Sequence, residues 1–213
     1  MMNPDEKQVR SILKKYSCPI QYHQVRTLFL GNIAIRKASA SPISVAKGLW
    51  GGQLPVFPTV EAGNELLDIL VNRLWNSLTR HKKPSEPFQL VRTPAEPTRA
   101  GISAYVLMRC EEVDGFVEGL LNGQDDVYLP EKADTSIEVM GELRTMLGAV
   151  HAIATCDTKV STDRRFVEFS GMLKQLDELT SRVEHEINTV VLSCTRSHRQ
   201  RLNVFDFSGP TFH

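Results

Sequence analysis

The sequence lacks an excess of charge of either sign. Its 213 residues include 25 Lys and Arg against 25 Asp and Glu, so the formal net charge is zero. The long-range field that draws a protein onto nucleic acid or an anionic membrane is therefore missing, and such binding would need a local patch. We expect a protein partner rather than nucleic acid.

Long apolar runs and a secretory leader are also lacking. The longest apolar runs span only a few positions, whereas a membrane-spanning helix needs about 20. The first six residues have neither the cationic nor the apolar stretch of a secretory signal. We expect a cytoplasmic location and no membrane partner.

Signatures of metal, cofactor or catalytic chemistry are absent from the sequence. The four cysteines have no close pair, which favours reduced, packed thiols over a zinc knuckle or a redox dithiol; they are Cys18, Cys110, Cys156 and Cys194. The six histidines show no ligand spacing, and there is no nucleophile elbow or phosphate-binding glycine loop. We predict no catalytic residue, metal or cofactor from motifs.

Apolar residues recur at spacings of three and four through most of the chain, which is typical of amphipathic helices. We predict an all-α bundle of about six to seven helices, the last one long, forming a single domain over residues 1–203. Residues 204–213 form a C-terminal tail. The predicted helices cover residues 4–18, 22–37, 42–50, 60–83, 98–121, 130–154 and 165–203.

A proline-rich segment interrupts this pattern. Residues 83–97 hold four of the eleven prolines, and proline favours extended backbone at and before its own position. We predict an extended arm here, which is also the best candidate for a boundary within the domain.

Two glycines lie four residues apart in the helix predicted over 98–121. Gly115 and Gly119 share one face, and each costs about 1 kcal/mol of helix propensity against alanine. Such a loss indicates that something packs closely over that face, and the ordinary occupant is the backbone of a neighbouring helix.

The last helix carries apolar residues at a period close to 3.5, interrupted by Thr180. This seam can pair with a second copy, giving a homodimer or partner interface, or lie along the core of its own domain. Its candidate residues are Phe169, Leu173, Leu176, Val183, Ile187 and Val190.

Three functions are compatible with these features. The first is a non-enzymatic helical interaction or regulatory protein, suggested by the seam. The second is an enzyme whose site is assembled from scattered residues such as His23, Glu118 and His151. The third is a nucleic-acid-binding regulator acting through the C-terminal basic residues, which are Arg196, Arg199 and Arg201, with Arg164 and Arg165. The zero net charge disfavours this third function.

Part of the chain resembles a known bacterial family. The residues concerned include Leu30-Gly31-Asn32-Ile33-Ala34, Ser41-Pro42-Ile43, Leu49-Trp50-Gly51-Gly52 and Asp114 to Leu120. Together with the leucine-rich helix ending in Trp75-Asn76, they resemble the uncharacterised YecA/YgfB-like family over residues 25–125. The family's Cys/His metal-binding segment has no counterpart here. The resemblance implies an all-α fold and no established activity.

Overall fold

The chain is all-helical in the computed structural model, which describes residues 4–35, 41–121, 127–155 and 162–206, with side chains from 171 to 201 in the last range. No strand occurs within these ranges, so the all-α prediction is confirmed. None of the described helices is long and apolar enough to cross a membrane. The N-terminal helices are α1 (Pro4–Lys15), α2 (Tyr22–Ile35), α3 (Pro42–Gly48) and α4 (Val60–Leu67).

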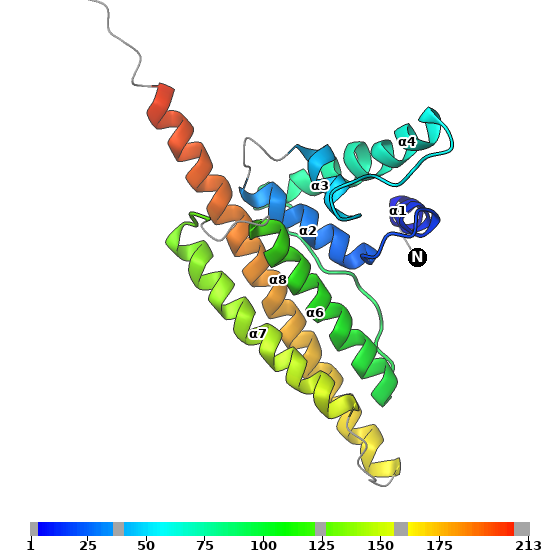
Figure 1. Cartoon of the computed structure of the whole chain (residues 1–213). Helices are drawn as coiled ribbons and strands as arrows, with labels where there is room; N and C mark the ends of the chain where they lie inside the picture. Colours follow the sequence, from blue (N-terminus) through cyan, green and yellow to red (C-terminus); the bar gives the residue numbers. More distant parts are fainter. Residues whose placement is uncertain (1–3, 36–40, 122–126, 156–161, 207–213) are drawn as a thin grey trace, which may run out of the picture.

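Three long helices form the main bundle: α6 (Arg99–Leu121), α7 (Glu131–Thr155) and α8 (Thr162–Asp206). They lie side by side in Figure 1, and α8 projects beyond the other two at its C-terminal end. Contacts fix the antiparallel direction of α6 and α7, because Arg144 pairs with Asp114 at 2.9 Å while His151 lies 3.2 Å from Ser103. The prediction of a long final helix is confirmed by α8. This helix ends at Asp206, three residues past its predicted end. Residues 207–213 of the predicted tail lie outside the described residues.

The apolar seam of α8 lies inside the bundle. Leu176, Val183, Ile187 and Val190 are all fully buried within the chain. Thr180, the polar break in the seam, is buried too, and its hydroxyl lies 3.0 Å from the Tyr105 hydroxyl. Of the two alternatives for the seam, these four residues take the second: they lie along the core of their own domain and offer no surface to a second copy.

The remaining two seam residues differ from these four. Leu173 is partly buried and packs against the core. Phe169 lies outside the residues whose side chains the structure describes.

Helices α2 and α6 touch through their backbones. A Cβ atom added to Gly115 would lie 2.8 Å from the Gln24 carbonyl oxygen, and one added to Gly119 would lie 2.8 Å from the Leu28 carbonyl carbon. Gly31 of α2 is equally close to α6, since its Cβ would lie 2.6 Å from the Leu120 nitrogen. The two glycines singled out in the sequence thus lie where a neighbouring helix backbone crosses them.

The helix predicted over 60–83 forms, but it is not a uniform α-helix. After α4 it continues as the π-helical η1 (Asp68–Trp75), the short α5 (Asn76–Leu78) and the 3₁₀ turn η2 (Thr79–Lys82). An α-helix makes about 3.6 residues per turn, so a row of every fourth residue would drift off the core side. The wider i→i+5 turns keep that row inward, and its members Leu66, Leu70, Leu74 and Leu78 are all buried.

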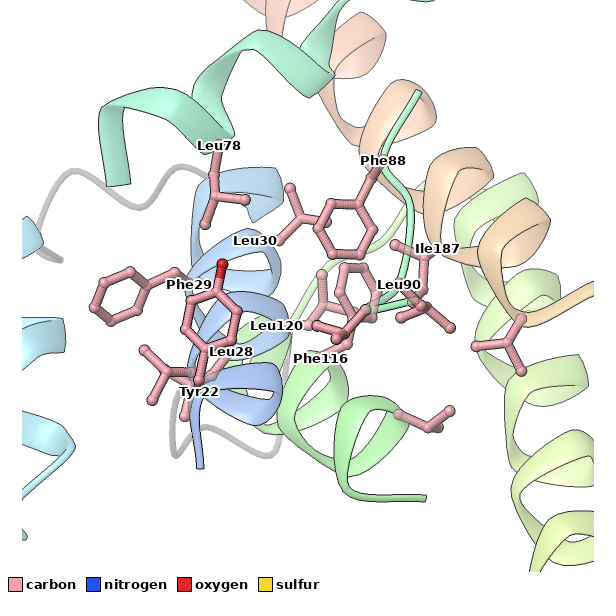
Figure 2. Close-up of a cluster of buried hydrophobic side chains, with 14 of the residues drawn as sticks. Tyr22, Leu28, Phe29, Leu30, Leu78, Phe88, Leu90, Phe116, Leu120 and Ile187 are labelled. Atoms are coloured by element: carbon pink, nitrogen blue, oxygen red, sulfur yellow. The ribbon is translucent and has the colours of Figure 1, made fainter. Parts of the chain in front are cut away.

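Residues 83–98 connect η2 to α6 and include the arm predicted over 83–97, although residues 83–86 form a turn, in which the Glu86 N–H donates to the Lys83 carbonyl. In Figure 1 the arm runs along α2 and α6 to the start of α6. Figure 2 shows Phe88 and Leu90 among the buried side chains of α2, α6 and α8, and their exposed fractions are 1% and 2%. The arm is therefore part of the core and ties the N-terminal helices to the bundle.

Candidate functional site: an extended arm and an arginine-lined cleft

Side chains of α8 bind the backbone of the arm. A buried extended segment without a partner strand must find hydrogen-bond partners elsewhere. The Phe88 N–H donates to Asn188 Oδ1 at 2.7 Å, and Asn188 Nδ2 donates to the Phe88 carbonyl at 2.9 Å. The Leu90 N–H donates to Glu184 Oε1 at 2.8 Å. Asn188 and Glu184 are four residues apart on α8, so both reach the arm from one helix face.

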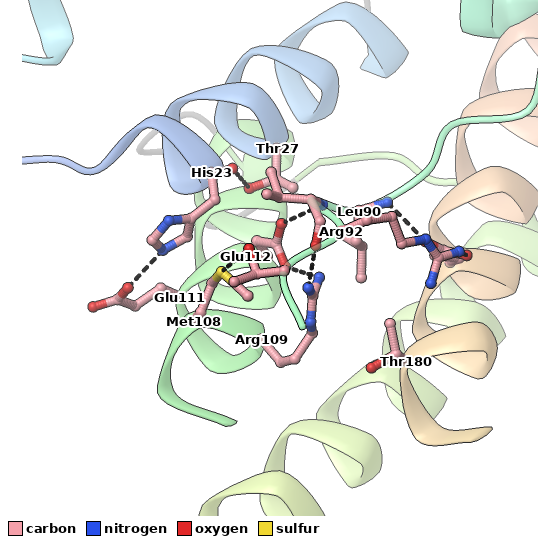
Figure 3. A network of polar contacts seen from close by, with 12 residues as sticks. His23, Thr27, Leu90, Arg92, Met108, Arg109, Glu111, Glu112 and Thr180 are labelled. Carbon is pink, nitrogen blue, oxygen red and sulfur yellow. Dashed lines mark hydrogen bonds and ion pairs between the residues drawn. The ribbon is translucent and has the colours of Figure 1, made fainter. Parts of the chain in front are cut away.

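A buried ion pair of α6 binds the next residue of the arm (Figure 3). The Val91 N–H donates to Glu112 Oε1 at 3.1 Å, while Arg109 donates both to the Val91 carbonyl and to Glu112. Arg109 and Glu112 are almost completely buried. Burial raises the pKa of Glu112 to about 7, against the opposing effects of the Arg109 charge and the Val91 N–H.

The arm forms one wall of a cleft of about 740 Å³. Arm residues Pro87 and 89–94 line it, and the N-terminal helices and η2 supply the other residues. Four arginines lie in its lining against a single glutamate, Glu6. These arginines are Arg10, Arg26, Arg80 and Arg92. Arginines thus outnumber acidic residues in the lining of this cleft, in a chain of zero net charge.

Arg26 differs from the other three arginines in its partners. It donates to the Gln89 carbonyl at 3.1 Å and lies over the rings of Tyr22 and Phe88, 5.8 Å and 4.8 Å from their centroids. No carboxylate of the described residues forms an ion pair with it. Its positive charge is thus stabilised by ring faces and a carbonyl, without a direct ion pair to a carboxylate of the described residues.

The other three arginines each have an acidic neighbour. Arg10 pairs with Glu6 at 2.8 Å, and its guanidinium also covers the Tyr22 ring. The Arg92–Glu184 distance is 2.8 Å. Arg80 is the most weakly held, at 3.9 Å from Glu86 and with 60% of its side chain exposed.

His81 borders the same cleft without adding charge at neutral pH. Its Nδ1 lies 2.8 Å from the Glu86 carbonyl, and its ring meets that of Phe88 edge to face. Burial lowers the pKa of His81, with the nearby Arg80 charge acting in the same direction. The imidazole is therefore neutral at neutral pH. Its contact with the Glu86 carbonyl positions the start of the arm.

The chemistry available to this cleft is anion binding. Guanidinium groups present planar donor forks that match carboxylate and phosphate oxygens. Within the described ranges, no group of three His, Cys, Asp or Glu side chains could hold a metal ion.

The scattered residues considered for an enzyme are not brought together. His23 pairs with Glu111 at 2.6 Å, and burial lowers the pKa of His23 although that carboxylate raises it. His151 contacts Ser103, eight residues earlier on α6 than Glu111, which is about 12 Å along the helix. Glu118 lies on α6 seven residues after Glu111, and its side chain is exposed. These groups occupy three separate places and share no site.

The C-terminal basic residues have different neighbours. Arg199 lines a separate cavity of about 320 Å³ with His198 and Lys82, whereas Arg201 lies over the Tyr128 ring at 4.5 Å. Arg196 is exposed. The side chains of residues 164 and 165 lie outside the described part of α8.

Sequence reasoning missed the arm's anchors and the cleft. One signal was present: Arg109 and Glu112 lie three residues apart among the apolar residues of α6 that face the core, and a charged pair on a buried face indicates a paired, functional or structural polar contact. No comparable signal marks the cleft arginines, because they come from four separate segments.

Comparisons with known proteins add no relative. No protein-family model, curated protein or solved structure matches the chain. The resemblance to the YecA/YgfB-like family therefore stays a prediction.

Proposed function

We propose that this chain is a non-enzymatic interaction protein that binds an anionic partner in the arginine-lined cleft. The observation that carries the proposal is Arg26, a cation at the cleft wall without an acidic partner among the described residues. An anion entering the cleft would supply the missing counter-ion. Arg80, weakly held by Glu86, is the second donor free to turn toward it.

The rigidity of the cleft wall favours binding. The arm is held by Asn188, Glu184 and Glu112 through its backbone, so its position does not depend on the ligand. A preformed site loses less conformational entropy when a partner binds. The cleft thus combines a fixed wall with Arg26, a cation that has no direct ion pair among the described residues.

Thermal unfolding with anionic probes tests this function. A probe that binds only the folded chain at a hundredfold excess over its Kd adds about 2.7 kcal/mol of stability, which raises Tm by roughly 5–10 °C for a chain of this length. We expect citrate, inorganic triphosphate or octaglutamate to produce such a saturable shift. Arg26→Ala should remove most of it.

The matched control is Lys174→Ala, which removes an exposed cation of α8 that does not line the cleft. This variant should keep the full shift. If no probe gives a saturable shift, or if both variants respond alike, the cleft is not an anion-binding site and the proposed function is wrong.

A further inference from the structure

We infer that the anionic partner of the cleft is an extended acidic segment of another protein. This inference rests on the proposed function and specifies the ligand class. Four features of the cleft carry it: its length, the spread of its arginines, the glutamates beside three of them, and the covered state of its aromatic rings.

The cleft is long for a compact anion. Its arm wall spans residues 87–94, and an extended chain advances about 3.3 Å per residue, so this wall is more than about 20 Å long. The volume of about 740 Å³ lies within the range of sites for drug-sized ligands and exceeds what a single phosphate fills. A single phosphate or small dicarboxylate would contact only a fraction of it.

The arginines are distributed along this length. Arg80 belongs to η2, which directly precedes the arm, Arg26 bonds to the arm at Gln89, and Arg92 lies in the arm itself. Cations that follow one another along an extended wall match an extended ligand with acidic groups at intervals. Arg10 and Arg26 lie over the same Tyr22 ring, whereas Arg92 lies further along the arm beside Glu184.

The glutamates beside the arginines favour sparse carboxylates over a dense polyanion. Glu6, Glu86 and Glu184 each lie next to a cleft arginine. A backbone with a phosphate at every unit would be brought close to these carboxylates and repelled. A peptide can place its acidic side chains at Arg26 and Arg80 and put neutral residues opposite the glutamates.

The aromatic rings of the cleft are not available for stacking nucleic-acid bases. Tyr22 and Phe88 are 8% and 1% exposed, and guanidinium groups cover their faces. Proteins that bind single-stranded nucleic acid use open aromatic faces as stacking platforms. The zero net charge of the chain also disfavours a nucleic-acid partner.

Fluorescence anisotropy with labelled octaglutamate tests the inference, with diglutamate, inorganic triphosphate and octauridylate as unlabelled competitors. We expect octaglutamate to bind at least about tenfold more tightly than diglutamate, because several arginines act together. Arg26→Ala and Arg80→Ala should each weaken binding by about five- to tenfold. Arg80 is exposed on a turn, so its variant keeps the fold even if Arg26→Ala does not; Lys174→Ala should bind as the parent chain does.

The remaining outcomes each overturn the inference in a distinct way. If triphosphate competes as well as octaglutamate and depends on Arg26, the cleft takes a compact anion, and the proposed function stands without the inference. If octauridylate binds more tightly than octaglutamate through the same arginines, the partner is a nucleic acid. If no probe binds, both the inference and the proposed function fail.

Discussion

Replacing Gly119 by alanine tests the backbone contact between α2 and α6. The new Cβ would lie 2.8 Å from the Leu28 carbonyl carbon and 2.9 Å from the Leu28 Cα, closer still to the Leu28 carbonyl oxygen. All three atoms belong to a helix backbone, which cannot turn aside as a side chain can. Overpacking of this kind costs up to about 3 kcal/mol, and the gain in helix propensity returns about 1 kcal/mol. We expect a net loss of about 2 kcal/mol.

Gly141→Ala is the matched control. Gly141 lies inside α7, and a Cβ there meets nothing within 4 Å. The same substitution should therefore stabilise the chain by about 0.5–1 kcal/mol through helix propensity alone. Urea denaturation followed by far-ultraviolet circular dichroism gives both midpoints. If Gly119→Ala raises the midpoint as Gly141→Ala does, the close crossing of α2 and α6 is wrong.

Three further predictions concern the arm and the buried thiols. Burial raises the pKa of Glu112 to about 7 from an ordinary 4.5. The protonated Glu112 side chain therefore contributes fully to the free energy of unfolding below about pH 4.5. This contribution falls by up to about 1.4 kcal/mol per pH unit as the pH rises toward 7. Glu112→Gln should lack that slope in urea denaturation across this range, and an unchanged slope would refute the raised pKa. Asn188→Ala leaves the Phe88 N–H and carbonyl without partners and should cost about 2 kcal/mol or more, with faster proteolysis within the arm; equal cleavage rates would contradict the anchoring. Burial raises the pKa of Cys110 and raises that of Cys194 to about 11, so mass spectrometry should find both unmodified by a maleimide until the chain unfolds, and rapid labelling of the folded chain would count against their burial.

Much of the fold could be predicted from local patterns. The helices and the proline-rich arm form at the expected places, with helix boundaries shifted by a few residues. The helix over 60–83 was predicted, although not the π-helical turns that keep Leu66, Leu70, Leu74 and Leu78 buried on one side. The seam of α8 likewise predicted burial, but its period could not say whether the covering surface belongs to the same chain or to another copy. That question depends on which helices α8 meets.

The candidate site could not be predicted in the same way. The gaps between consecutive members of Arg10, Arg26, Arg80 and Arg92 are 16, 54 and 12 positions, so no spacing rule relates them. They line one cleft because α1, α2, η2 and the arm meet there. The partners of Arg109 and Glu112 on the arm are just as remote in the sequence.

The sequence alone therefore determined the elements of this protein: where the chain is helical, where prolines keep it extended, and which faces are apolar. These properties depend on neighbours within a turn or two, and a periodic pattern records them directly. Only the tertiary structure decided which cations share a wall and which backbone groups a distant asparagine or glutamate binds. Such contacts depend on how whole helices pack, and no short stretch of residues contains that information.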